Sequence, residues 1–168
     1  MIKKLFVILL TLYVSTSYGQ DETTLVKKAD KVPVFEFEKS PGVKANISDY
    51  KGKTVLITFF ATWCGPCRQE LPEIQEKIYN KYKNNPNFVL LIFGREHNWK
   101  EVDEFKTTNK YDMPFFPDPG RNVFSKFATQ SIPRNFLISG DGKVVFSSIG
   151  YEEKAFKSLQ AAIAEQLK

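Results

Sequence analysis

A mostly apolar run at residues 54–61 leads almost directly into a helical pattern, and this junction is the strongest structural signal in the chain. The run is rich in β-branched and aromatic side chains, which favour a strand. Further along, Leu71, Ile74 and Ile78 recur three or four positions apart, as expected on one face of a helix. Pro72 lies inside this pattern and should kink the helix, because proline lacks a backbone donor and crowds the preceding turn.

The segments on either side of this junction predict two hairpins. Phe35 and Phe37 alternate with acidic residues, which is typical of a strand with one buried face, and a turn signal at 40–42 follows. Near the other end, Asp141-Gly142 separates two apolar runs, a strong hairpin signal. The expected elements are strands 32–38, 43–47 and 54–61, helix 68–79, strand 88–93, helix 99–109, an irregular proline-rich stretch 113–120, a short helix 121–128, strands 135–139 and 143–147, and helix 152–168.

This order of strands and helices predicts an α/β fold, with a mixed sheet that carries helices on its faces. A length of 168 residues favours one domain, and 42% hydrophobic residues with 15 Phe can form a core without disulfides. We expect residues 1–19 to be a signal peptide, 20–31 a flexible polar lead-in, and 32–168 the domain.

The first nineteen residues have the three-part layout of a secretory signal peptide. Lys3 and Lys4 precede an apolar run at 5–14, and small residues including Ser17 and Gly19 follow it. The run is shorter than the ~20 residues of a membrane-spanning helix, although an uncleaved membrane anchor stays open as an alternative. The mature protein is therefore expected to be exported to the periplasm, where disulfides can persist.

The net charge of +5 does not point to nucleic acid as a partner. Such partners are recognised by clustered Lys and Arg interleaved with aromatic residues, and the chain shows no such cluster. We therefore expect no nucleic-acid binding.

The candidate chemistry lies in the two cysteines of the chain, Cys64 and Cys67, which fall at the junction of strand and helix. A thiolate is the form that attacks disulfides, and the first turn of a helix favours negative charge through its unpaired N–H groups and its dipole. Cys67 lies three residues further on, on the same helical face, where it could attack a mixed disulfide formed at Cys64. The pair therefore predicts thiol–disulfide exchange.

The cysteine pair is also compatible with a zinc site, a static disulfide or two inert buried thiols. A zinc site needs about four ligands, and His97 is the single histidine that could join the two cysteines. We expect His97 to be a solvated loop residue, so that no metal and no cofactor is implied. A static disulfide between residues so close in sequence would remove little entropy from the unfolded chain.

The segment Trp63-Cys-Gly-Pro-Cys67, after an apolar strand, resembles the signature of the thioredoxin-like superfamily. Residues 55–72, residues 131–138 and the following Asp141-Gly142-Lys143 resemble its exported TlpA/ResA-type branch. The resemblance extends from about residue 30 to residue 168. It implies the thioredoxin-like fold, with a mixed central sheet flanked by helices and the N-terminal β-hairpin as an extension.

The resemblance also implies roles for individual residues. Cys64 would be the exposed nucleophile and Cys67 the resolving cysteine. Pro133 matches the cis-proline that packs beside the redox disulfide in this superfamily. Ile132 would offer its backbone to a bound substrate chain, and Trp63 would lie on the same substrate-binding surface.

Glu70 matches an acidic position that tunes the cysteine pKa values in ResA-like proteins, but an ordinary acid in the first turn of the helix is the alternative. Thr58 marks a departure from the pattern. Thioredoxins proper carry a buried aspartate at this position, and a hydroxyl is a poor proton acceptor. We therefore expect proton handling at Cys67 to differ from that of thioredoxin, with Glu70 or water in place of the aspartate.

In function, the resemblance implies a thiol–disulfide oxidoreductase outside the cytoplasm. Gly65-Pro66 between the cysteines resembles the reducing members of the superfamily. Substrates would be disulfides in exported proteins, including the haem-binding cysteines of apocytochrome c, and electrons would come from a membrane thiol donor. We expect a monomer.

Two alternative functions are a thiol peroxidase of the same fold and a non-catalytic binding scaffold with a static disulfide. The first usually has a Pro-x-x-x-Thr/Ser-x-x-Cys pattern, which is missing before Cys64.

Overall fold

The apolar run becomes the central strand of a five-stranded sheet. In the computed structural model, which describes residues 21–168, this strand is β3 (Thr54–Phe60). It pairs in parallel with β4 (Phe88–Arg95) and antiparallel with β6 (Arg134–Ile138). The edges are β5 (Phe115–Asp118) and β7 (Val144–Ile149), in the order β5-β4-β3-β6-β7. The expected mixed sheet is therefore confirmed, while the expected leader and residue 20 lie outside the described residues.

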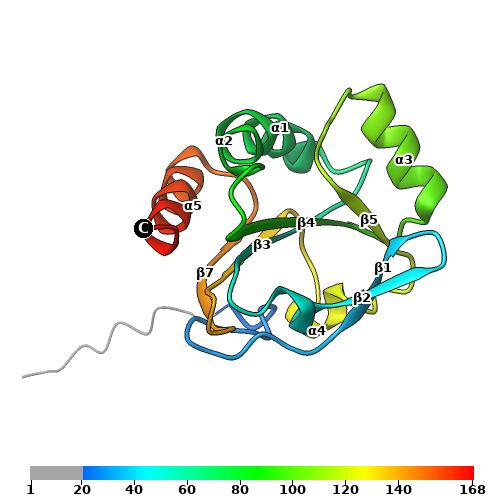
Figure 1. Cartoon of the computed structure of the whole chain (residues 1–168). Helices are drawn as coiled ribbons and strands as arrows, with labels where there is room; N and C mark the ends of the chain where they lie inside the picture. Colours follow the sequence, from blue (N-terminus) through cyan, green and yellow to red (C-terminus); the bar gives the residue numbers. More distant parts are fainter. Residues whose placement is uncertain (1–20) are drawn as a thin grey trace, which may run out of the picture.

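Helices cover one face of the sheet and a hairpin with a short helix covers the other (Figure 1). The covering elements on the first face are α1 (Gly65–Ile74), α2 (Asn80–Tyr82), α3 (Trp99–Thr108) and α5 (Glu153–Gln166). On the second face lie the hairpin of β1 (Glu36–Ser40) and β2 (Val43–Asn46), a 3-10 turn at Ile47–Tyr50, and α4 (Phe124–Phe127). The expected N-terminal hairpin is confirmed.

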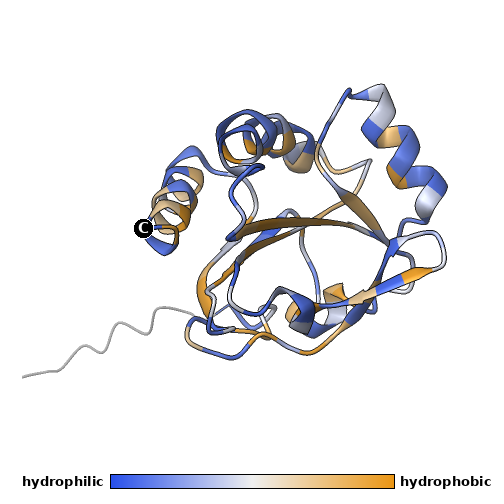
Figure 2. Cartoon of the chain, viewed as in Figure 1, coloured by the Kyte–Doolittle hydropathy of each residue, from blue (hydrophilic) through white to orange (hydrophobic). Residues whose placement is uncertain are grey.

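Strand β3 is mostly apolar because both of its faces are buried. Leu56 and Phe60 pack into the cluster under the helices, whereas Ile57 and Phe59 pack into the cluster beneath the hairpin and α4. Figure 2 shows hydrophobic colour along the central strands and mixed colours on the helices, as expected when each helix buries one side. Thr54 and Thr58 are the polar residues of the run, and Thr58 is fully buried.

Strand β5 was not predicted, because its proline-rich sequence indicated an irregular stretch. The structure pairs it in parallel with β4, from Phe115 opposite Ile92 to Asp118 opposite Arg95. Pro117 is tolerated because β5 is an edge strand, where one side of the backbone needs no ladder partner. Local sequence could not reveal this strand, since its existence depends on a partner more than twenty residues earlier.

The helix after the cysteines is irregular beyond Pro72. A π-helical turn at Gln75–Tyr79 separates α1 from α2, and the Gln75 N–H donates to the carbonyls of both Leu71 and Pro72. A proline inside a helix leaves one carbonyl of the previous turn without its donor, which is a common cause of such disturbances. Within residues 21–168, no helix is long and apolar enough to cross a membrane.

Residues 21–31, which we expected to be a flexible lead-in, are attached to the domain along their length. The Leu25 N–H donates to the Phe127 carbonyl (2.9 Å), and the Ala29 N–H donates to the Val144 carbonyl (2.8 Å). Val26 is buried in the cluster beneath the hairpin. The polar composition suggested a loose segment, but the backbone groups find partners far along the chain.

Phe59 gives a test of this core, because its fully buried ring contacts those of Phe93, Phe124 and Phe136 at centroid distances of 5.8, 5.3 and 6.3 Å. We expect Phe59→Ala to lower the free energy of unfolding by about 3–5 kcal/mol, because it removes buried area and leaves a cavity. Val34→Ala, at a residue that is 72% exposed, should change it by less than about 0.5 kcal/mol. Urea denaturation measures both, and equal stabilities would contradict the assigned core.

Candidate active site

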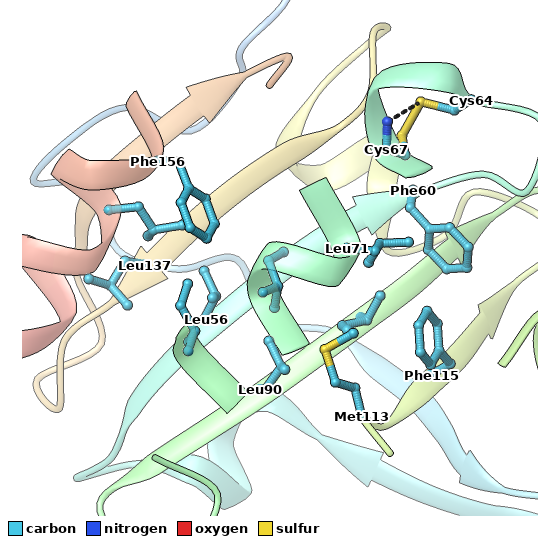
Figure 3. Close-up of a cluster of buried hydrophobic side chains, with 14 of the residues drawn as sticks. Leu56, Phe60, Cys64, Cys67, Leu71, Leu90, Met113, Phe115, Leu137 and Phe156 are labelled. Carbon is cyan, nitrogen blue, oxygen red and sulfur yellow. Dashed lines mark hydrogen bonds between the residues drawn. A yellow bond between two sulfur atoms is a disulfide. The ribbon is translucent and has the colours of Figure 1, made fainter. Parts of the chain in front are cut away.

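Cys64 and Cys67 form a disulfide at the N-terminus of α1, with their Cα atoms 5.3 Å apart. Cys64 is the N-cap residue in extended conformation, and its sulfur accepts the Cys67 N–H at 3.2 Å. Figure 3 shows the pair at one end of the hydrophobic cluster that contains Phe60 and Leu71. Cys67 is fully buried and Cys64 is 5% exposed, so Cys64 is the sulfur-bearing residue nearer the solvent.

A segment from far along the chain lies against this disulfide. The carbonyl oxygen of Ile132 is 3.7 Å from the Cys64 sulfur, although 68 residues separate them. The peptide bond between Ile132 and Pro133 is cis. Strand β6 starts immediately afterwards and pairs with β3 from Arg134 opposite Phe59, which carries the Ile132–Pro133 loop to the cysteines.

Trp63 precedes the disulfide and leaves 65% of its surface exposed. The guanidinium of Arg95 lies 5.6 Å from the centroid of the Trp63 ring and 5.3 Å from the centroid of the Phe124 ring. Both rings therefore make a cation–π contact with Arg95. The structure thus brings the Cys64–Cys67 disulfide and the Ile132–Pro133 loop together, and Trp63 adjoins Cys64 in the chain. The remaining candidate, Glu70, lies inside.

Glu70 is 2% exposed, in the second turn of α1, so it is not an ordinary solvated acid of the first turn. Its Oε1 accepts a hydrogen bond from the Asn135 side-chain amide at 2.7 Å, and its buried Oε2 has no partner among the described residues. Burial raises the pKa of Glu70 to about 7, and the bond from Asn135 opposes that rise.

Asn135 links Glu70 to Thr58, the residue that replaces the buried aspartate of thioredoxins proper. The Thr58 hydroxyl donates to the Asn135 Oδ1 at 2.8 Å, because the two residues are opposite each other in the antiparallel pair of β3 and β6. Asn135 was not among the predicted site residues. The available signal was a polar residue inside an apolar strand just after Ile132-Pro133, at a position where burial requires a partner.

His97 was wrongly expected to be a solvated loop residue, since it is 4% exposed. Its Nε2 accepts the Thr62 N–H at 2.9 Å, so a neutral ring carries its proton on Nδ1. Gly94 makes this approach possible, because a Cβ there would lie 3.0 Å from the His97 Cβ and 2.6 Å from Val102. His97 thus holds the backbone two residues before Cys64. Its polar neighbours in the sequence hid this role, since they suggested a solvated loop.

Metal binding has no support in the part of the chain that the structure describes. Residues 21–168 contain no group of three or more His, Cys, Asp or Glu side chains that could hold an ion.

A disulfide at the N-terminus of the first long helix, faced by a cis-proline loop on a mixed sheet, is the arrangement of thioredoxin-like proteins. The sequence pattern of the Redoxin family matches residues 27–163, and the chain belongs to this family.

Relatives of known name and structure agree with this assignment. The chain is 32% identical over 146 residues to the thiol-disulfide oxidoreductase ResA of Bacillus cereus, a match covering 86% of this chain and 80% of the relative. It is 28% identical over 135 residues to ResA of Bacillus subtilis, covering 80% and 73%. The solution structure of a candidate protein disulfide isomerase from Bacteroides thetaiotaomicron superimposes with a TM-score of 0.82 at 34% identity, covering 86% and 92%. The resemblance to the ResA-type branch is confirmed.

Glu70 should make stability fall as the pH rises. Its folded-state pKa of about 7 lies above the usual 4.5, so between these values the folded protein binds a proton that the unfolded chain releases. The Glu70→Gln side chain cannot ionise, so the variant does not lose stability in this way. Its free energy of unfolding minus that of wild type should therefore rise by as much as about 3 kcal/mol between pH 4.5 and a pH above 7.

Urea denaturation of the oxidised proteins across this pH range measures the effect. Glu76→Gln, at an exposed acid after α1, is the control and should follow the wild-type profile. Parallel profiles for wild type and Glu70→Gln would contradict the raised pKa.

His97→Ala should leave the Thr62 N–H without its acceptor, at a loss of roughly 1–3 kcal/mol in the free energy of unfolding. Hydrogen exchange of the Thr62 amide, followed by NMR, should accelerate more than that of neighbouring amides. His97→Gln keeps an acceptor on a side chain of similar reach and should restore part of the protection. Unchanged exchange at Thr62 in His97→Ala would show that the hydrogen bond does not hold this turn.

Proposed function

We propose that this protein is a thiol–disulfide oxidoreductase in which Cys64 and Cys67 cycle between dithiol and disulfide. One observation carries the proposal: the Cys64–Cys67 disulfide lies at a helix N-terminus with the Ile132 carbonyl 3.7 Å from its outer sulfur. The membership of the Redoxin family and the similarity to ResA proteins support it.

In the proposed cycle, the Cys64 thiolate attacks a disulfide of the substrate. A mixed disulfide forms and one substrate sulfur leaves as a thiolate. The Cys67 thiolate then attacks the Cys64 sulfur, which restores the Cys64–Cys67 disulfide and releases the second substrate thiol. Two electrons pass from the dithiol to the substrate, and the two protons of the dithiol balance the two new substrate thiols.

Cys64 is assigned as the nucleophile on its position. It is the more exposed of the two, and the Cys67 N–H at 3.2 Å points at its sulfur from the first turn of the helix. Such donors, together with the helix dipole, favour the thiolate. Cys67 is buried one turn inside, where a substrate disulfide cannot reach it but a mixed disulfide on Cys64 can.

The substrate chain would bind across Ile132 and Trp63. The Ile132 carbonyl can accept a backbone N–H of an extended peptide, as an added strand would, and the exposed indole of Trp63 offers apolar area beside the reacting sulfur.

Glu70 would handle the protons of the buried cysteine. It lies one helical turn after Cys67, and a carboxyl with a pKa of about 7 can accept or release a proton near neutral pH. The Thr58–Asn135 pair holds its Oε1 and leaves Oε2 without a partner among the described residues, so one oxygen is available for exchange.

We further propose that the protein is an exported periplasmic reductant. The leader-like residues 1–19 support export, and Gly65-Pro66 between the cysteines supports the reducing direction. The substrates would be disulfides of exported proteins, apocytochrome c among them, and a membrane thiol protein would supply electrons to a monomeric enzyme.

Cys67→Ala tests the cycle, because Cys64 can still attack but nothing resolves the mixed disulfide. Incubated in its reduced form with insulin, this variant should accumulate a covalent adduct that dithiothreitol releases, while Cys64→Ala should form none and reduce insulin only at the uncatalysed rate. Non-reducing gels and turbidity measure these outcomes. Equal partner capture by wild type and both variants would instead indicate a non-catalytic scaffold. A redox titration tests the direction: a reduction potential of the Cys64–Cys67 couple above about −150 mV would contradict the reducing role.

A further inference from the structure

Arg134 is a charged residue that the proposed cycle leaves without a role. It follows Pro133 directly, begins β6 and is fully buried. A buried charge is tolerated only where hydrogen bonds and opposite charges replace water. Its partners therefore show what it is built to hold, and they lie on two separate segments.

The first segment is the loop that faces the disulfide. The Arg134 Nε–H donates to the carbonyls of Gln130 (2.9 Å) and Ser131 (3.2 Å). Ser131 has φ of 67°, a left-handed conformation that is uncommon outside glycine and that needs surrounding contacts to persist. Arg134 thus holds the peptide that leads directly into Ile132, whose carbonyl lies beside Cys64.

The second segment, residues 21–26, is here called the N-terminal strap. Arg134 Nη1 donates to the Thr24 hydroxyl at 2.6 Å, and Nη2 donates to the Thr23 hydroxyl. The Asp21 carboxylate lies 3.5 Å from Nη1 and accepts hydrogen bonds from both threonine hydroxyls. The strap is also paired with the chain before the loop, through the Thr129 N–H and the Thr23 carbonyl at 3.0 Å.

We propose that Arg134 is a positioning residue that couples the N-terminal strap to the Ile132–Pro133 loop, so that the strap completes the support of the substrate-binding surface. The guanidinium reaches the loop with Nε and the strap with Nη1 and Nη2, a division that lysine cannot reproduce. Without the strap, the guanidinium would lose the Asp21 carboxylate and the hydroxyls of Thr23 and Thr24. The Arg134 side chain would then hold the loop less firmly. The inference rests on the proposed function only for its effect on catalysis.

The sharpest variant is the double substitution Thr23→Val and Thr24→Val. It keeps the side-chain shape but removes both strap acceptors, while the Arg134 bonds to the loop carbonyls remain possible. Ile163→Val, in the core beneath α5, serves as a control that lowers stability without touching loop or strap. Arg134→Lys tests the other side of the link, since it keeps the charge and loses the two-sided reach.

The reduced proteins are assayed on a disulfide-bonded peptide, which needs the loop backbone, and on 2-hydroxyethyl disulfide, which does not. For the double variant and for Arg134→Lys we expect kcat/KM on the peptide to fall at least fivefold, mainly through KM. The rate on the small disulfide and the redox equilibrium with glutathione should stay within twofold of wild type. The control should keep the wild-type ratio of the two rates. An unchanged ratio in the double variant would overturn the proposal.

An NMR measurement separates this inference from the proposed function. Amide signals of Ser131 and Ile132 should shift or broaden in the double variant and stay in place in Ile163→Val, whether or not the protein is an enzyme. If wild type reduces neither substrate, the proposed function fails while this comparison still decides the role of the strap. Signals of the loop that are identical in all three proteins would refute the coupling.

Discussion

The antiparallel register between β3 and β6 is the constraint on which the candidate active site depends. With Thr58 opposite Asn135 and Phe59 opposite Arg134, the segment before β6 arrives beside Cys64. A slip of one residue would turn every side chain of β6 to the opposite face. Asn135 would then leave Glu70, and Arg134 would face the core beneath the helices. Such a slip would also move Phe136 and Ile138 out of the cluster beneath the hairpin and Leu137 out of the cluster under the helices.

Thr58, Asn135 and Glu70 form a hydrogen-bonded polar network that is buried in the hydrophobic core. Placing a carboxyl among hydrophobic side chains favours its neutral form, and one amide hydrogen bond offsets only part of that effect. The result is a carboxyl group with a pKa of about 7, one helical turn after the buried Cys67. Thioredoxins proper place an acid on the strand itself, whereas here the strand offers a hydroxyl and the acid comes from the helix. The acidic group therefore belongs to helix α1 and not to strand β3.

Two segments outside the core complete the site in a similar way. His97 accepts a backbone N–H just before the cysteines, and the N-terminal strap supplies hydroxyl and carboxylate partners to Arg134 just after the cis-proline. In each case a buried polar side chain is hydrogen-bonded to specific backbone or side-chain groups of another segment. The backbone before the cysteine pair and the loop that faces it are therefore both held by hydrogen bonds to buried side chains.

The sequence by itself determined the strand–helix junction, the cysteine pair upon it, both hairpins and the class of fold. These features are local: apolar periodicity, turn residues and a short motif specify them within a dozen positions. Glu70 was marked as a candidate only by resemblance, and its burial became visible only in the tertiary structure. Strand β5, the attachment of residues 21–31, the burial of His97 and the partners Asn135 and Arg134 were decided by tertiary structure alone. Each depends on a hydrogen bond or ladder between segments far apart in the chain, and a one-dimensional pattern carries no information about which distant backbone group will be there to accept it.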